Sequence, residues 1–198
     1  MKIALKLILF FLCLLCTGCA PAQTQPPTSS TSPVSQRISP PGKTNCALLL
    51  REIWNQYDPQ EQFSVYGGMQ QRPVPEAPGD LDMEEPVLWF SQYCLPAAHQ
   101  QHILQGASLQ HLLSGNLFTA AAFQVEADAL PAFARDWRAE LLGSHWVNGP
   151  PQRLLLAQVN QEYLVMAFGS RRHIKSFQRM LLYTYPSAQI LCCEPFSL

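Results

Sequence analysis

Residues 153–168, RLLLAQVNQEYLVMAF, contain two apolar runs that are separated by Asn160 and Gln161. Each run, 153–159 and 162–168, has the length of a β-strand. A two-residue separation suits a tight hairpin, because asparagine tolerates the positive φ that such a turn requires. We therefore predict an antiparallel β-hairpin over these residues.

Two segments before the hairpin predict a strand and a helix. Residues 118–125 are apolar and are followed by charged residues, which is typical of a strand. Residues 131–142 begin with Pro131, whose missing N–H costs little in the first turn of a helix, and they place Phe133, Trp137 and Leu141 at helical spacing. We expect this amphipathic helix to lie on a core.

A second helix and a last strand are expected after the hairpin. Ser170 is a suitable N-cap, and the apolar positions Ile174, Phe177 and Leu181 follow it at helical spacing. Residues 189–193 predict the last strand. This order, β-α-β-β-α-β, is that of the ferredoxin-like arrangement. We therefore predict an α+β fold in which a four-stranded antiparallel sheet carries both helices on one face.

The residues that precede this unit are expected to be largely helical. Residues 44–57 place apolar side chains at helical spacing, and residues 96–113 are predicted to be rich in helix although they are polar. Residues 60–86, which are rich in Pro, Gly and acidic side chains, favour no particular element. Residues 44–198 have the size of one ordinary domain with its own core.

The N-terminus has the features of an export signal. Lys2 and Lys6 accompany an apolar run over residues 3–16. This run is shorter than the roughly 20 residues that a membrane-spanning helix needs. A removed signal peptide is therefore a better interpretation than a transmembrane helix.

The end of this signal indicates a lipid anchor. Residues 16–19, CTGC, resemble the lipobox of bacterial lipoproteins, in which the cysteine at the cleavage site carries a diacylglyceryl group. We predict a signal peptide over residues 1–18 and lipidation of Cys19, and two acyl chains on one residue give stable anchoring. An ordinary secretory cleavage near Ala20 or Ala22 is the alternative.

A spacer is predicted between the anchor and the domain, over residues 19–43. It is dense in Pro, Ser, Thr and Gln and has almost no large apolar side chain, so it cannot form a core. Its expected reach is roughly 30 Å as a flexible coil and at most about 75 Å when extended. A proline-rich docking peptide is the alternative. We expect the domain to lie outside the cytoplasm, on the cell membrane or the outer membrane.

The charge of the chain gives no reason to expect a nucleic-acid partner. Loss of Lys2 and Lys6 with the signal changes the formal net charge from −1 to −3. The charges are uneven, because acidic residues gather at positions 80–85 and a basic cluster lies near a predicted helix start at Arg171, Arg172 and Lys175. This cluster is a candidate contact for an anion or a lipid headgroup. A solvated helix face is the alternative.

Candidate catalytic groups are few. His99 and His102 stand three positions apart in a predicted helix and could offer two imidazoles to a metal, with Cys94 or His111 as a further ligand. The sequence has no serine in a glycine-flanked elbow and no phosphate-binding glycine loop. We therefore expect no cofactor. An enzyme or metal-binding protein that uses the two histidines and nearby carboxylates remains the alternative.

The predicted domain retains four cysteines, Cys46, Cys94, Cys192 and Cys193. Export permits disulfides, so one or two bridges can form, and their pairing stays open because the sequence does not determine connectivity. Small buried apolar thiols are the alternative.

Several features follow one another in a fixed order. They are the lipobox, the spacer, the acidic segment LDMEE at 81–85, and the apolar runs FTAAAFQV at 118–125 and EYLVMAF at 162–168. In this order the chain resembles small lipoproteins of Gram-positive-type bacteria that carry a domain of unknown function. The resemblance implies a membrane-anchored surface protein and brings no catalytic residue. We therefore expect a non-enzymatic binding or accessory module of the cell envelope, with an envelope protein as a partner.

Overall fold

The computed structural model describes residues 45–146 and 149–196, which lie in the second of the two units of the chain, Pro40–Leu198. The predicted signal peptide, Cys19 and the spacer lie outside the described residues. No helix within the described ranges is long and apolar enough to cross a membrane.

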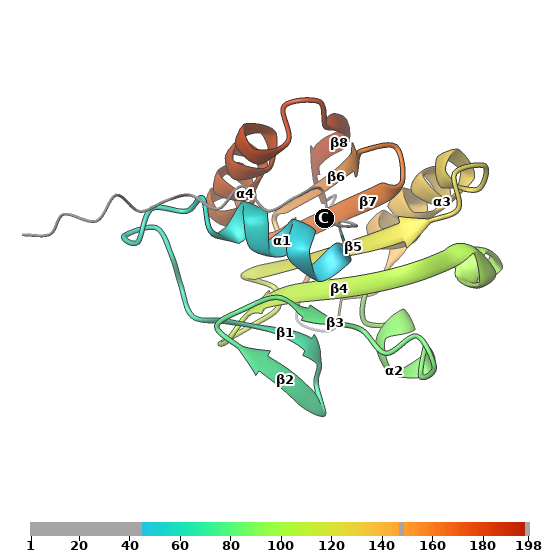
Figure 1. The fold of residues 1–198 in the computed structure, drawn as a ribbon, viewed down its shortest axis with the longest axis horizontal. Coiled ribbons are helices and arrows are strands. Elements are labelled where there is room, and N and C mark those ends of the chain that lie inside the picture. The colour runs from blue at the N-terminus through green and yellow to red at the C-terminus, as the bar shows by residue number, and fades with distance from the viewer. Residues whose placement is uncertain (1–44, 147–148, 197–198) are drawn as a thin grey trace, which may run out of the picture. The chain divides into compact units, whose positions relative to one another are not determined.

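An antiparallel sheet of eight strands organises these residues (Figure 1). Seven strands follow one another in space: β2 (Arg72–Pro75), β1 (Val65–Met69), β4 (Ile103–His111), β5 (Phe118–Val125), β7 (Tyr163–Gly169), β6 (Arg153–Val159) and β8 (Gln189–Pro195). The short β3 (Gly79–Asp80) pairs with β4. The helices are α1 (Cys46–Trp54), α2 (Val87–Phe90), α3 (Leu130–Gly143), α4 (Arg171–Thr184) and the 3-10 helix η1 (Ala97–His102).

The predicted hairpin is confirmed as β6 and β7. The ladder ends at the pair of Val159 and Tyr163, so the turn has one residue more than predicted. Asn160 and Gln161 both adopt positive φ, 48° and 63°. Every residue of β7 is buried, because this strand lies inside the sheet with packed side chains on both faces.

Helices cover both faces of the sheet. Alternate residues of β5 point to opposite faces, so Ala120 packs in the core with α1 and α4, and Phe123 packs in the core with α3. The predicted helices over 131–142 and after Ser170 are confirmed as α3 and α4. Their predicted apolar positions are all buried: Phe133, Trp137, Leu141, Ile174, Phe177 and Leu181.

The α+β class and the antiparallel sheet are confirmed, but the four-stranded sheet with both helices on one face is wrong in detail. The strands β5, β7 and β6 keep the ferredoxin-like order, whereas β8 pairs with β6 because β4 occupies the position beside β5. The crossover through α3 joins β5 to β6, and the crossover through α4 joins β7 to β8, so both run in the same direction across the sheet. They start from β5 and β7, which are antiparallel to each other. Right-handed crossovers of this kind place their helices on opposite faces.

The region before β5 differs more from the sequence-based expectation. The predicted helix over 44–57 is present as α1, which Asn45 caps by accepting a hydrogen bond from Leu48 N at 2.7 Å. The predicted helix over 96–113 is wrong beyond His102, because the chain continues as β4. This strand pairs with β1, β3 and β5, and these pairings override its polar sequence. Residues 60–86 supply β1, β2 and β3.

Candidate functional site

Three segments that are far apart in the sequence meet at one end of the sheet. They are residues 112–117 between β4 and β5, residues 149–152 before β6, and residues 169–171 at the start of α4, and we call them the loop end. Asn116 Nδ2 donates to Gly149 O at 3.0 Å, Ser170 N donates to Leu117 O at 2.9 Å, and Arg171 N donates to the Gln152 side chain at 2.9 Å. These hydrogen bonds join the three segments into one surface.

Three aromatic rings support the loop of residues 112–117, which we call the leucine loop. The ring centroid of Phe63 lies 5.0 Å from that of His111 and 4.4 Å from that of His173. His111 Nδ1 accepts a hydrogen bond from Leu113 N at 3.0 Å, whereas His173 Nδ1 donates to Leu117 O at 2.9 Å. Burial, together with the nearby imidazole of His173, lowers the pKa of His111. The two histidines therefore hold both ends of the leucine loop.

The leucine loop exposes large apolar side chains. Leu113 is 82% exposed, Leu112 is 57% exposed and Leu117 is 38% exposed. A single exposed leucine is ordinary, but neighbouring ones that form a patch are typical of an interaction site.

An apolar groove of about 350 Å³ lies beside the leucine loop. Its walls include Tyr66 from β1, Pro73 and Pro75 from β2, and Leu112 from the loop itself. The prolines lie on an exposed edge strand, where they discourage pairing with another strand. Because Leu112 belongs to both, the groove and the leucine loop form a continuous surface.

The predicted basic cluster lies at the other side of the leucine loop. Ser170 is the N-cap of α4, as predicted, and its Oγ accepts a hydrogen bond from His173 N at 3.3 Å. Arg171, Arg172 and Lys175 are exposed, and the first turn of α4 contains no acidic residue. In the part of the chain that the structure describes, none of the three forms a salt bridge. Their positive charges are therefore available to an external anion.

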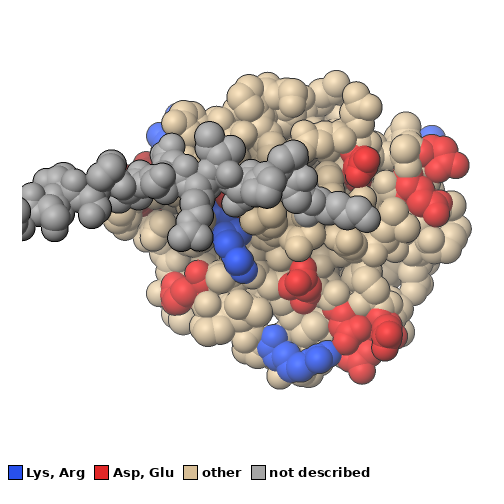
Figure 2. Space-filling view, viewed as in Figure 1, with Lys and Arg blue, Asp and Glu red and all other residues tan. Residues whose placement is uncertain are grey.

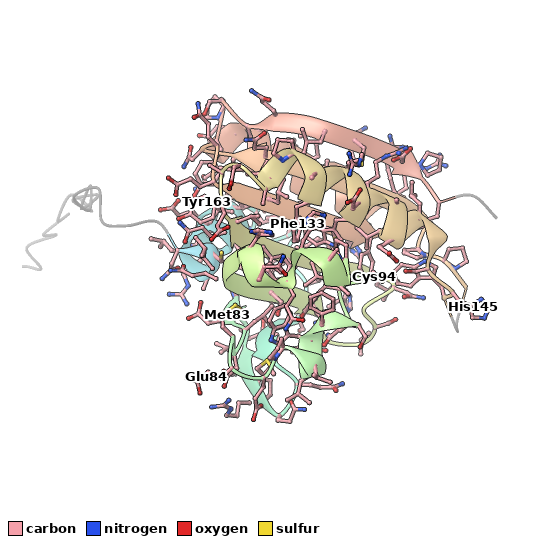
Figure 3. All side chains as sticks on the ribbon, turned by 90° about the vertical axis from the view of Figure 1, so that its right-hand side faces the viewer. Met83, Glu84, Cys94, Phe133, His145 and Tyr163 are labelled. Carbon is pink, nitrogen blue, oxygen red and sulfur yellow. The ribbon has the colours of Figure 1, made fainter. Side chains whose placement is uncertain are left out.

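The acidic segment, residues 80–85, lies toward the end of the sheet opposite the loop end. In Figure 2 acidic side chains gather at the lower right, near α2, where the exposed Glu84 and Glu85 precede that helix, and other acidic side chains lie elsewhere on this face. Asp82 Oδ1 accepts a hydrogen bond from Glu84 N at 3.0 Å, and its Oδ2 lies 2.8 Å from Arg72. The Glu84 amide and the Arg72 guanidinium lower the pKa of Asp82. This arrangement shapes a turn, and Figure 3 shows Glu84 and Met83 beside each other on it.

The structure brings His99 and His102 close together but pairs each with its own carboxylate. Their ring centroids lie 6.2 Å apart. His99 Nε2 lies 2.8 Å from Asp136 Oδ2, and His102 Nδ1 lies 2.6 Å from Glu126 Oε2. Arg135 and His99 lower the pKa of Asp136 to about 2. Across residues 45–146 and 149–196, no three histidine, cysteine or acidic side chains are placed to hold a metal ion.

The four cysteines are free thiols in the structure. Cys46 and Cys193 pack on the face of α1 and α4, and Cys94 and Cys192 pack on the face of α3, where Figure 3 shows Cys94 near that helix. Burial raises the pKa of Cys46 to about 12 and that of Cys192 to about 11. These positions fit the interpretation of small apolar side chains.

We compared the chain with known proteins. No family model, no curated protein and no solved structure matches it. The resemblance to small lipoproteins therefore stays a prediction, and the assignment of function depends on the geometry of the chain itself.

The apolar part of the loop end was not predicted from the sequence. Phe63, His111 and His173 come from distant segments, so their stacking has no local signal. The leucine loop does have one, because the turn-forming residues 114–116, SGN, stand between Leu113 and Leu117.

Proposed function

We propose that the chain is a membrane-anchored lipoprotein of the cell envelope and that its α+β domain is a non-enzymatic binding or accessory module. The lipobox-like residues 16–19 support the anchor. The loop end supports binding, because its groove and its exposed leucines form an apolar surface on a domain that already has its own core.

The histidines support this function better than catalysis. His99 Nε2 already contacts Asp136 of α3, and His102 Nδ1 already contacts Glu126 at the end of β5. These two contacts connect η1 to α3 and to β5. Contacts of this kind fix the position of a segment and need no substrate.

Site-specific photo-crosslinking in cells tests the proposal. A photoreactive amino acid replaces Leu113 in the loop end or Val87 on α2, which is 84% exposed and serves as the matched control. We expect reproducible crosslinks from position 113 to an envelope component, protein or lipid, that are lost in the Cys19→Ala chain, and few crosslinks from position 87. Equal products from both positions, or crosslinks that do not depend on Cys19, would contradict the proposal.

A second function, as an envelope enzyme or metal-binding protein, is favoured by the proximity of His99 and His102 to Asp136 and Glu126. Metal binding would require the two pairs to open toward each other. Zinc titration of the full chain and of its His99→Ala variant tests this function, which predicts weaker binding by the variant. Equal zinc binding by both chains would exclude it.

A further inference from the structure

Hydrogen bonds to neighbouring segments hold the leucine loop in place. Thr119 Oγ1 donates to Gly115 O at 3.0 Å, and Asn116 Nδ2 donates to Gly149 O at 3.0 Å. Together with the bonds that His111 and His173 form to Leu113 N and Leu117 O, these contacts fix the loop to the rest of the fold. The exposure of Leu113 is therefore a property of the folded domain, and no rearrangement is needed to present it.

Positive charge accompanies these leucines. Ser170 N donates to Leu117 O, so the start of α4 adjoins the leucine loop directly. Arg171, Arg172 and Lys175 project from this first part of α4, while exposed acidic side chains such as Glu84, Glu85 and Glu126 lie at the other end of the sheet. On the side of α4, the leucine loop is thus flanked by three cations that form no salt bridge within the described residues. On the side of the groove it is flanked by the exposed Glu76.

We infer that the loop end docks on the surface of an anionic lipid bilayer, an inference that rests on the proposed membrane anchor. Leu112 and Leu113 enter the boundary between headgroups and acyl chains, and the three cations contact the anionic headgroups. Apolar side chains flanked by Lys and Arg are the combination that binds such an interface. An uncharged apolar partner would leave these cations without a counter-charge.

The predicted anchor is compatible with this contact. The described chain begins at Asn45, which lies with Asp80 and Gly106 toward the end of the sheet opposite the loop end. The longest strand, β4, has 9 residues, which corresponds to about 30 Å. A predicted spacer that reaches at most about 75 Å can therefore let the loop end turn toward the bilayer that holds Cys19.

Fluorescence quenching by brominated lipids measures this contact at single positions. The full chain is bound to vesicles of phosphatidylcholine with brominated acyl chains, with and without phosphatidylglycerol. Leu113→Trp reports on the loop end, and Val87→Trp is the matched control on α2. The emission of the native tryptophans is subtracted by means of the unsubstituted chain.

We expect quenching of Leu113→Trp by vesicles that contain phosphatidylglycerol, and little quenching of Val87→Trp. Replacement of Arg171, Arg172 and Lys175 by Gln should lower the equilibrium constant for docking by about fivefold per residue, or about a hundredfold together. High salt should likewise weaken docking of the protein that retains these three side chains, because salt screens their attraction to the headgroups. Glu76→Gln should strengthen docking, because Glu76 lines the groove and repels the anionic surface.

The outcomes separate this inference from the proposed function. Equal quenching at positions 113 and 87 in protein that floats with the vesicles would overturn docking and leave the anchor intact. Quenching that ignores phosphatidylglycerol and salt would overturn the role of the cations. A full lipidated chain that does not float even with anionic vesicles would contradict both proposals, because the acyl chains on Cys19 and the loop end should each bind it to them. If Leu113→Trp stays unquenched in protein that floats, while the photoreactive group at position 113 crosslinks to an envelope protein, the loop end binds protein and not lipid, which also overturns the inference.

Discussion

Gly169 joins the fold to the loop end, and its replacement by alanine gives a sharp test of the structure. An added Cβ would lie 2.3 Å from Leu117 O and 2.8 Å from Leu117 C, which are backbone atoms that cannot move aside as a flexible side chain can. The residue also has a φ of 155°, which an alanine rarely adopts. Gly169→Ala should therefore force β7 away from the base of the leucine loop.

The expected cost combines two effects. Overpacking of a tight contact costs about 1–3 kcal/mol, and a strained backbone costs about 1–3 kcal/mol. A combined loss of about 3 kcal/mol is a large part of the roughly 5–15 kcal/mol that stabilises an ordinary domain. With a urea dependence of about 2 kcal/mol per M, the unfolding midpoint should fall by about 1.5 M.

Urea unfolding followed by tryptophan fluorescence measures this loss, and Gly143→Ala is the matched control. Nothing lies within 4 Å of the Cβ position at Gly143, which is in the last turn of α3. Alanine there should leave the protein as stable as before or more stable by about 0.5–1 kcal/mol. If Gly169→Ala unfolds at the same urea concentration as Gly143→Ala, the contact between residue 169 and the leucine loop is not as described.

Three further predictions concern stability and reactivity. Burial lowers the pKa of His111, so the unfolded chain takes up a proton at a higher pH than the folded protein. The free energy of unfolding should therefore be highest above about pH 6.5 and decrease as the pH falls below that value. The variant His111→Gln should show a smaller decrease over this pH range. Cys46 should resist alkylation in the folded protein and react only in urea, as mass spectrometry can show, because it is 1% exposed and burial raises its pKa to about 12; rapid labelling of the folded protein would contradict its position in the core. Ser170→Ala should destabilise the protein by about 1 kcal/mol in thermal unfolding, since it removes the N-cap of α4, whereas Ser170→Asp should retain most of the stability.

The elements with strong apolar periodicity were predictable from the sequence. The stripes on α3 and α4 and the hairpin of β6 and β7 each carry a local signal. The placement of the helices on opposite faces was not predictable in this way, because it depends on β4 lying beside β5. Residues of β4 such as Gln105 and Gln110 are polar, and Gln110 is buried, where its Nε2 donates a hydrogen bond to Tyr93 OH at 2.8 Å. A polar residue that finds its partner only in the folded chain gives no strand signal.

The candidate site shows the same limit. The basic cluster and the cap at Ser170 are contiguous in the sequence, so their association with a helix start could be predicted. The ring stack of Phe63, His111 and His173 depends on the folding of three separate segments. The exposed leucines had a turn signal beside them, but their exposure follows from which loops meet at that end of the sheet.

The most direct test of the proposed function is the mass of the first peptide of the mature protein, isolated from washed membranes and cleaved with trypsin. We predict a peptide over residues 19–37 that begins at Cys19 and carries a diacylglyceryl group. A first peptide that begins after Ala20 or Ala22 without lipid, or a peptide over residues 7–37 from a chain that keeps its signal, would contradict the anchor on which the proposed function depends.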